Sequence, residues 1–204
     1  FFFKQKTAYE IYQCDWSSDV CSSDFMLGLG HEVWVYNRNP SRADALVGAG
    51  AHRATHPADL AAQCEIVVSL LTDAAAVEQV YGGPQGLLSK PNAVLIESST
   101  VAPEFQEKMA RTAKQSGARY LECPVSGSIG PAKEGKLIGF VGGEAEVVNQ
   151  VRTFLDQMCR KVVLVGAHAA LHWKWVVRTT RRLFGLPNRR PPVPATVSAD
   201  AGTR

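Results

Sequence analysis

The chain has 204 residues, which is long enough for one domain with a proper core and too short for two large ones. Hydrophobic residues make up 46% and charged residues 20%, as in ordinary globular proteins, and no apolar run approaches the roughly 18 residues of a membrane-spanning helix. The net charge of +3 is uneven, because residues 178–204 carry six Arg and one Asp. No secretory signal is visible, so we expect a cytoplasmic location and no membrane partner.

Residues 1–24 show neither a helical nor a strand period and end in a cluster of Ser and Asp. We expect no regular structure in them. The stretch resembles translated sequencing-adapter DNA, which implies a non-native or disordered segment outside the fold.

Gly28 and Gly30 stand directly before the strand-like run Glu-Val-Trp-Val-Tyr at 32–36. A phosphate-binding Gly-x-Gly-x-x-Gly loop needs a strand before it and a helix after it, because the helix N-terminus must point its free amides at the pyrophosphate. Here the strand follows, so we expect these glycines to close a helix. The sequence therefore predicts a sheet that lacks its first strand and its glycine loop.

From residue 32 on, short apolar strands alternate with helices. Asn39 is expected to cap the next helix, with Pro40 at its first position and Gly48 or Gly50 at its end. Further strands are predicted at 65–71, 92–97, 119–125, 136–143 and 161–166, and further helices at 73–81, 103–116 and 144–157. This alternation predicts a Rossmann-like, doubly wound α/β fold with a mainly parallel sheet covered on both faces.

In a dinucleotide-binding fold, the end of the second strand recognises the adenosine ribose: an acid binds the hydroxyls of NAD, whereas Arg pairs with the 2′-phosphate of NADP. Asn37 and Arg38 stand at this position, with Arg42 one turn on and no acid between Tyr36 and Arg42. The alternative is that Asn37 and Asn39 are turn and cap residues and that Arg38 is a solvated charge. The absence of an acid favours NADP.

Two polar segments follow later strands. Glu-Ser-Ser-Thr at 97–100 places hydroxyls where doubly wound sheets bind ligands. The alternative, favoured from the residues alone, is that Ser99 or Thr100 caps the helix that begins near Pro103.

The second polar segment contains Ser126, Gly127, Ser128 and Gly130. Small residues let backbone amides and hydroxyls approach an anion such as a substrate carboxylate. A plain glycine-rich connection is an equal alternative.

Four stretches, in this order and spacing, resemble the NADP-binding domain of the beta-hydroxyacid dehydrogenase family: GHEVWVYNRNPSRADAL, GPQGLL, ESSTVAP and CPVSGSIGPAKEGKL. The resemblance runs from Gly30 to about Gly166. Members of this family transfer a hydride between a nicotinamide cofactor and a carbonyl or hydroxyl beside a carboxylate-bearing carbon. The resemblance therefore implies an NADP-dependent oxidoreductase that acts on a small 3-hydroxy acid or its semialdehyde or keto form.

The resemblance also assigns cofactor-binding residues. Asn37 and Arg38 correspond to the positions that bind the ribose phosphate. Leu71 and Thr72 correspond to a Leu-Pro that lines the cofactor, so Thr72 is a departure, and Thr100 corresponds to a Thr that contacts the cofactor.

Ser126, Gly127 and Ser128 correspond to a Ser-Gly-Gly substrate loop, in which Ser128 replaces the second Gly. Lys174 corresponds to the catalytic Lys, which would donate a proton to the substrate oxygen as hydride arrives. The Asn expected four residues later is Arg178 in this chain.

The resemblance implies three further parts besides residues 1–24. Residues 25–167 are expected to form an incomplete NADP-binding Rossmann domain, 168–177 the start of an interdomain helix, and 178–204 a basic, Pro-rich tail that is disordered or out of frame. The family's helical C-terminal domain, through which a full-length form would make a homo-oligomer, is expected to be missing, and the fragment to be inactive.

The alternative function is a non-catalytic Rossmann-like binding module whose basic tail holds nucleic acid. The tail has no aromatic residue besides Phe184 and no base-reading motif, so a solvated tail is favoured and a small carboxylate is the expected partner. His168 and His172 have metal-ligand spacing but no third ligand nearby, and the five cysteines lack any Cys-x-x-Cys, so no metal site is expected.

Overall fold

The computed structural model describes residues 6–11, 18–90 and 92–166 of the chain, with side chains described from residue 22 on. The strands are β1 Lys6–Ile11, β2 Glu32–Tyr36, β3 His52–Arg53, β4 Ile66–Leu70, β5 Val94–Glu97, β6 Arg119–Glu122, β7 Val125–Ser126, β8 Leu137–Gly143 and β9 Cys159–Gly166. The helices are α1 Ser18–Gly28, α2 Asp44–Gly48, α3 Pro57–Gln63, α4 Ala74–Tyr81, α5 Pro103–Gln115, α6 Ile129–Lys133, α7 Ala145–Gln150 and α8 Arg152–Met158, with 3₁₀ turns at Pro40–Ala43 and Leu87–Ser89. None of these described helices is long and apolar enough to cross a membrane.

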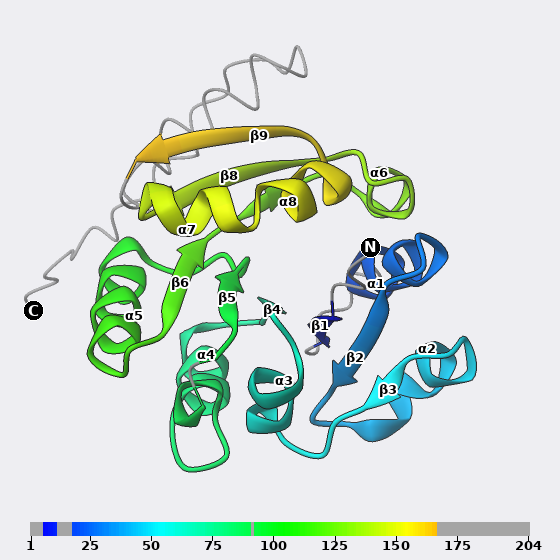
Figure 1. The fold of residues 1–204 in the computed structure, drawn as a ribbon, viewed down its shortest axis with the longest axis horizontal. Helices are drawn as coiled ribbons and strands as arrows, with labels where there is room; N and C mark the ends of the chain where they lie inside the picture. Colours follow the sequence, from blue (N-terminus) through cyan, green and yellow to red (C-terminus); the bar gives the residue numbers. More distant parts are fainter. Residues whose placement is uncertain (1–5, 12–17, 91, 167–204) are drawn as a thin grey trace, which may run out of the picture. The chain divides into compact units, whose positions relative to one another are not determined.

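The strands form one mostly parallel sheet, in the order β3-β2-β1-β4-β5-β6-β8-β7, with β9 paired to β8 (Figure 1). All neighbours from β3 to β6 are parallel. β8 runs antiparallel to β6 and β7 and parallel to β9. Parallel strands joined by helices confirm the predicted Rossmann-like α/β fold.

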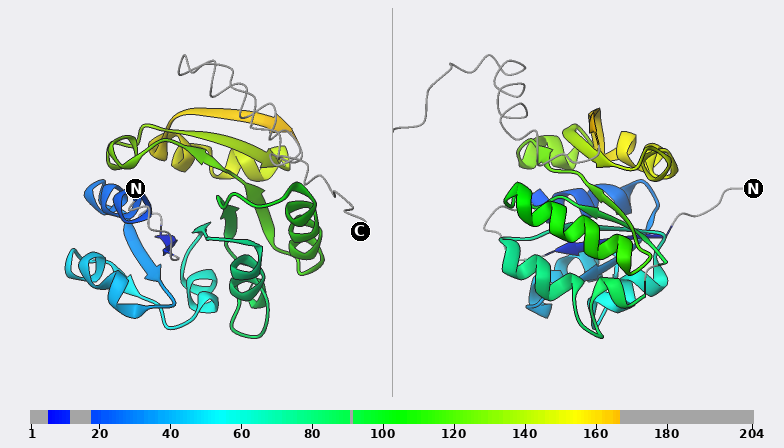
Figure 2. Two further views of the ribbon diagram at one scale, coloured as in Figure 1. Left: turned by 180° about the vertical axis from the view of Figure 1, so that it is seen from behind. Right: turned by 90° about the vertical axis from the view of Figure 1, so that its left-hand side faces the viewer.

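Two hydrophobic cores cover the two faces of this sheet. Successive strand residues point to opposite faces, so Ile66 and Val68 of β4 belong to one core and Val67 belongs to the other. The first core includes residues of α1, α2, α6, α7 and α8, and the second includes residues of α3, α4 and α5. On the second face α4 and α5 lie side by side (Figure 2), joined by an ion pair between Glu78 and Lys108.

The expectation that the sheet lacks its first strand is wrong. Lys6–Ile11 forms β1, which pairs in parallel with β2 on one side and with β4 on the other. The backbone groups of β2 and β4 that face each other need partners, and Lys6–Ile11, in which Thr7, Tyr9 and Ile11 favour strands, satisfies both rows. Residues 18–24, which were expected to be irregular, form the start of α1.

The prediction that Gly28 and Gly30 close a helix is confirmed. Gly30 has a left-handed φ of 85°, and its amide donates to the carbonyl of Leu27 while the His31 amide donates to Met26. This turn leads directly into β2. The predicted cap is also confirmed, because the Asn39 side chain accepts a hydrogen bond from the Ser41 amide.

Several predicted elements are divided in the structure. The strand expected at 119–125 becomes β6 and β7, because Pro124 has no amide hydrogen for the ladder. The helix expected at 144–157 becomes α7 and α8, with the break at Val151. The helices α3 and α6, each seven residues or fewer, were not predicted.

Candidate functional site

The carboxyl ends of the parallel strands lie at one edge of the sheet. Ser69 of β4 is in register with Glu97 of β5, and Glu97 with Glu122 of β6, so these three strands end level with one another. The segments after β2, β4, β5 and β6 therefore line up along this edge in the strand order. Such an edge is where open α/β sheets bind ligands.

The end of β2 carries the residues expected at the adenosine ribose. Asn37 is buried, and its Oδ1 accepts a hydrogen bond of 2.9 Å from the Asn39 amide. Asn37 therefore acts as a turn residue, as the alternative from the sequence expected. This hydrogen bond does not depend on a ligand. Arg38 is exposed beside a cavity of about 260 Å³. That cavity is lined by Tyr36, Arg38, His56, Pro57, Gln79, Val80, Gly82, Gly83, Pro84 and Gln85.

The end of β4 leads into the N-terminus of α4. Leu71 is buried, whereas Thr72 is exposed and donates a hydrogen bond of 3.3 Å to Asp73. Asp73 caps α4 through a bond of 2.9 Å from the Ala76 amide. The exposed Thr72 therefore lies at the edge of the sheet between two fixed residues. Leu71 before it is buried, and Asp73 after it caps α4.

The end of β5 is tied to the end of β4. The Ser99 hydroxyl accepts a hydrogen bond of 2.6 Å from the Leu71 amide. The expected alternative, that Ser99 or Thr100 caps α5, is wrong, because the N-cap residue of α5 is Ala102. Thr100 is exposed at the same edge. The Ser98 hydroxyl is buried and has no hydrogen-bond partner within the part of the chain that the structure describes.

A buried carboxyl group lies beneath this edge. Glu97 is fully buried, and its Oε2 accepts a hydrogen bond of 2.6 Å from the Ser69 hydroxyl. Its Oε1 accepts another of 2.6 Å from the Ser99 amide. Burial raises the pKa of the Glu97 carboxyl above its ordinary value, and the hydrogen bonds from Ser69, Ser99 and Tyr81 oppose part of that increase.

The predictions from sequence missed the role of Glu97 and Ser69. The available signal was an acid at the end of an otherwise apolar strand, where a side chain of β5 must point into one of the two cores. A buried acid needs hydrogen-bond partners, and these come from Ser69, 28 residues earlier in the chain.

The small-residue loop follows β6 through Pro124. Ser126 is half-buried in β7, in register with Ile138 of β8, while Gly127 and Ser128 are exposed. A Cβ added to Gly127 would lie 2.5 Å from Cδ2 of Leu137, so a side chain there would require Leu137 to move. The loop is therefore anchored by β7 and β8 while its tip faces outward.

The other predicted site residues lie outside the described residues. These are the catalytic candidate Lys174 and the two histidines, His168 and His172. In the described part of the chain no group of three His, Cys, Asp or Glu side chains is placed to hold a metal ion.

Comparison with known proteins gives consistent matches. Residues 24–166 match the model of a family described as the NAD binding domain of 6-phosphogluconate dehydrogenase. The chain is 38% identical over 151 residues to 3-hydroxyisobutyrate dehydrogenase of Pseudomonas aeruginosa, covering 71% of this chain and 49% of that protein. It is 33% identical over 147 residues to the NAD-dependent L-serine dehydrogenase of the same organism, with the same two coverages of 71% and 49%.

A solved structure, Psf3 in complex with NADP+ and 2-OPP, matches with a TM-score of 0.74 at 25% identity, covering 89% of this chain and 69% of that one. The chain spans about half the length of the curated relatives it matches. The family match begins at Asp24, inside α1, so β1 lies outside it.

Proposed function

The chain belongs to the family described as the NAD binding domain of 6-phosphogluconate dehydrogenase, and from this premise we propose that it binds NADP(H) as part of a hydroxyacid dehydrogenase. The observation that carries the proposal is the end of β2, where Arg38 borders a cavity of about 260 Å³. No acidic residue stands between Tyr36 and Arg42. A guanidinium with no carboxylate beside it in sequence suits the 2′-phosphate of NADP, since that phosphate carries charge that the hydroxyls of NAD do not.

The remaining residues at the edge fit a dinucleotide that lies across the sheet. The adenosine end would lie at Arg38, after β2. The nicotinamide end would lie at the segments after β4 and β5, which present the exposed hydroxyls of Thr72 and Thr100. β1 stands between β2 and β4, so the pyrophosphate would cross the connection from β1 to α1.

That connection departs from a dinucleotide-binding loop. Its residues 12–17 lie outside the described residues, and the sequence contains no glycine before Gly28. A Cβ on every residue hinders the close approach of backbone amides to a pyrophosphate. We therefore propose that the chain holds the cofactor weakly, by its two ends, and does not turn over a substrate as it stands.

The substrate would be a small 3-hydroxy acid or its semialdehyde or keto form. NADPH, when bound, supplies the hydride. Backbone amides of Gly127 and Ser128 and the hydroxyl of Ser126 would hold the substrate carboxylate, as small residues after a strand can. By family resemblance, the Lys174 ammonium would donate the proton to the carbonyl oxygen.

Calorimetric titration of the whole chain tests the cofactor assignment. Adenosine 2′-phosphate reaches only the Arg38 end of the site, so its binding does not depend on the glycine loop. We expect adenosine 2′-phosphate to bind at least about tenfold more tightly than adenosine, since one charge-assisted hydrogen bond supplies that difference. For the same reason NADPH should bind more tightly than NADH. Equal affinities within both pairs would reject NADP as the cofactor. NADPH oxidation with added small semialdehydes would show measurable turnover if the proposed inactivity is wrong.

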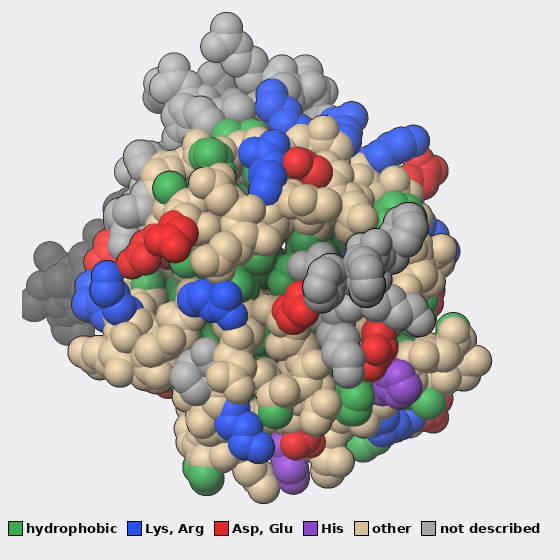
Figure 3. Space-filling model, viewed as in Figure 1, with side chains coloured by type: hydrophobic (Ala, Val, Ile, Leu, Met, Phe, Trp, Pro, Cys, Tyr) green, Lys and Arg blue, Asp and Glu red, His purple; other side chains and the backbone are tan. Residues whose placement is uncertain are grey.

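The second candidate function is nucleic-acid binding through the Arg-rich residues 178–204. On the face shown in Figure 3, some of the described basic side chains are already paired with acidic ones. Around α6, α8 and β9 basic side chains are mixed with acidic ones (Figure 3), and Lys136 pairs with Glu134 at 2.6 Å and Arg152 with Asp156 at 2.8 Å. A salt-dependent shift of labelled DNA that disappears on deleting 178–204 would favour this function over cofactor binding.

A further inference from the structure

The two oxygens of the Glu97 carboxyl group bind different parts of the edge. Oε1 accepts the Ser99 amide and Oε2 accepts the Ser69 hydroxyl, each at 2.6 Å. Glu97 has no exposed surface, so these bonds are shielded from water. A shielded hydrogen bond to a carboxyl group is stronger and more directional than one at the surface. The carboxyl group thus fixes the backbone two residues beyond its own strand.

The Ser69 hydroxyl is held by a third buried group. Its Oγ lies 2.7 Å from the hydroxyl of Tyr81 at the end of α4. When the Glu97 carboxyl group is ionised, Ser69 donates its single hydroxyl proton to it, so Tyr81 is the donor of the other bond. The chain of hydrogen bonds therefore runs from α4 through β4 to the carboxyl group of β5, and each member has its partner.

Ser99 extends the chain to the other loop. Its amide is the donor to Glu97, and its hydroxyl is the acceptor for the Leu71 amide at 2.6 Å. The amides of Leu71 and Ser99 each precede an exposed threonine by one residue, Thr72 after β4 and Thr100 after β5. The buried carboxyl group of Glu97 therefore fixes, directly at Ser99 and through Ser99 at Leu71, the backbone next to the two exposed threonines.

We propose that Glu97 is a positioning residue, which holds the segments 71–72 and 99–100 together in the geometry that receives the nicotinamide end of the cofactor. This inference rests on the proposed cofactor-binding function. The carboxyl group touches no ligand; it acts through Ser99 and Leu71. The register neighbour Glu122 is equally buried but ends the strand that leads to the substrate loop, which makes it a matched control.

Amide hydrogen exchange of the whole chain without ligand tests the hydrogen-bond chain. In Glu97→Ala the Ser99 amide loses its acceptor, and the Leu71 amide keeps an acceptor, the Ser99 hydroxyl, that is no longer held in place. Both amides should therefore exchange at least about tenfold faster. In Ser99→Ala only the Leu71 amide should do so, because the backbone bond from Ser99 to Glu97 remains. Unchanged exchange at Leu71 in Glu97→Ala would overturn the proposal, as would an equal effect of Glu122→Ala on these two amides.

Ligand titration tests the role of this chain in binding. NADPH reaches both ends of the site and adenosine 2′-phosphate only one, so the ratio of their affinities measures the nicotinamide end. Glu97→Ala should reduce this ratio about tenfold without changing the affinity for adenosine 2′-phosphate. A general loss of structure would weaken both ligands alike, and an unchanged ratio would overturn the proposal.

Glu97→Gln is the conservative variant. Its amide oxygen can accept the Ser99 amide, and its NH₂ can donate to Ser69, whose hydroxyl then turns to Tyr81. We expect the NADPH ratio and both exchange rates to remain within about twofold of the wild type. A loss as large as that of Glu97→Ala would overturn the proposal.

Two results would need a further measurement: a Glu97→Ala variant that does not fold, and a wild type that binds neither ligand. If Glu97→Ala does not fold, Ser69→Ala removes the bond to Oε2 of Glu97 with a smaller disturbance, and the same two amides and the same affinity ratio are measured. An absence of change in either readout would overturn the proposal. If the wild type binds neither ligand, the proposed function fails, while the exchange of the Leu71 and Ser99 amides still decides whether Glu97 holds the two segments.

Discussion

The hydroxyl of Ser69 donates a hydrogen bond of 2.6 Å to Oε2 of Glu97, between neighbouring strands and out of contact with water. Burial raises the pKa of this carboxyl group, and the bond from Ser69 offsets only part of the increase. The folded protein therefore holds a proton at Glu97 at pH values where the unfolded chain, with an ordinary pKa of 4.5, has released it.

This difference predicts how stability depends on pH. Stability from a raised carboxyl pKa is fully present below pH 4.5 and is lost as pH rises through the folded pKa, because the unfolded state then binds fewer protons. Glu97→Gln cannot titrate. Urea unfolding in steps upward from pH 4.5 should show the wild type losing free energy of unfolding relative to Glu97→Gln. A wild type that gains stability relative to the variant over this range would contradict the direction of the shift.

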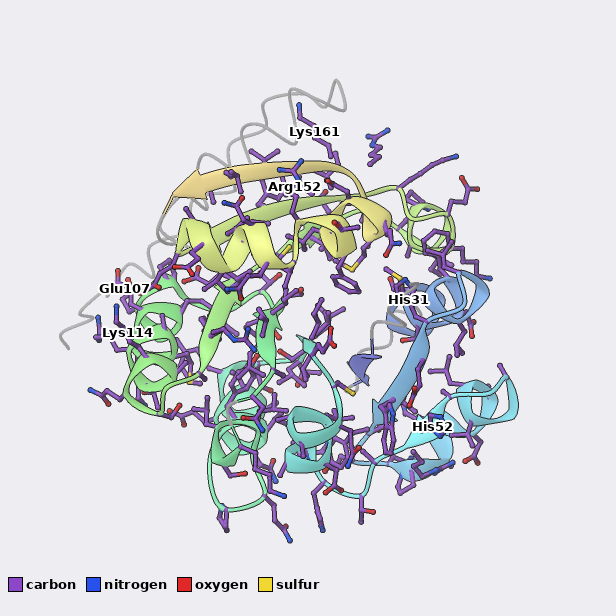
Figure 4. All side chains as sticks on the ribbon, in the orientation of Figure 1. His31, His52, Glu107, Lys114, Arg152 and Lys161 are labelled. Atoms are coloured by element: carbon purple, nitrogen blue, oxygen red, sulfur yellow. The ribbon has the colours of Figure 1, made fainter. Side chains whose placement is uncertain are left out.

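Arg38→Asp is expected to change cofactor preference. Reversing the charge beside the cavity removes one charge-assisted hydrogen bond to the 2′-phosphate, so NADPH binding should weaken by roughly 1–3 kcal/mol and NADH binding should change little. The control is Arg111→Asp on α5, which lies toward the other end of the sheet from β2 and carries Glu107 (Figure 4). Arg111 is exposed and pairs with the half-buried Glu107. An equal loss of both cofactors, or the same loss in the control, would remove the basis for assigning Arg38 to the phosphate.

Gly135→Ala is expected to destabilise the packing of the turn after α6 against α1 and α8. Gly135 is buried with φ +64°, and an added Cβ would collide with the backbone oxygen of Gln157 and lie 2.6 Å from the ring of Phe25. Gly117 has a similar φ of +78° but open space around it, so Gly117→Ala carries only the backbone strain, about 1–2 kcal/mol. Urea unfolding should show Gly135→Ala to cost at least about 1 kcal/mol more than the control.

The same pair of variants tests where α1 lies. Phe25 belongs to α1, the helix that follows β1, and its ring reaches Gly135 only if α1 packs against the turn that follows α6. If Gly135→Ala were no worse than Gly117→Ala, the packing of this helix would differ from the one described.

The elements that could be predicted are those with a local signal. The strands around Val67 and Leu95 are short apolar runs bounded by polar residues, and the turn at Gly30 follows from a helix that meets a strand within four residues. Pro124 shows the limit of such patterns, because the predicted strand runs through it while its nitrogen has no hydrogen to donate, and β6 and β7 are separate strands on either side of it.

What could not be predicted depends on partners distant in the chain. β1 is a strand because β2 and β4 offer it two rows of backbone partners. The sequence of residues 6–11 alone does not indicate that this position in the sheet is open to it. Likewise, Ser99 was expected to cap a helix, but its hydroxyl binds Leu71, 28 residues earlier. The exposed site residues such as Arg38 and Thr100 were located from their position after a strand, whereas the buried groups that hold them required the tertiary structure.

The thiols of Cys123 and Cys159 lie close to one backbone position in the first core. A Cβ added to Gly139 would lie 3.2 Å from one sulfur and 3.1 Å from the other. Burial raises the pKa of Cys123 well above its usual range, and burial together with the Asp156 carboxylate raises the pKa of Cys159 to about 12. Since the thiolate is the reactive form, both should be inert in the folded protein.

Thiol labelling checks this expectation in a variant with Cys14→Ser and Cys21→Ser, whose remaining cysteines are all buried. At about pH 8 a thiol with a pKa near 12 is ionised to roughly one part in ten thousand, so an aromatic disulfide reagent should label no cysteine within minutes, and all of them in urea. Thr72→Cys, at an exposed position, should react at once under the same conditions and so shows that the reagent is active. Rapid labelling of Cys123 or Cys159 in the native protein would mean that the first core opens beside β8 far more often than its close packing implies.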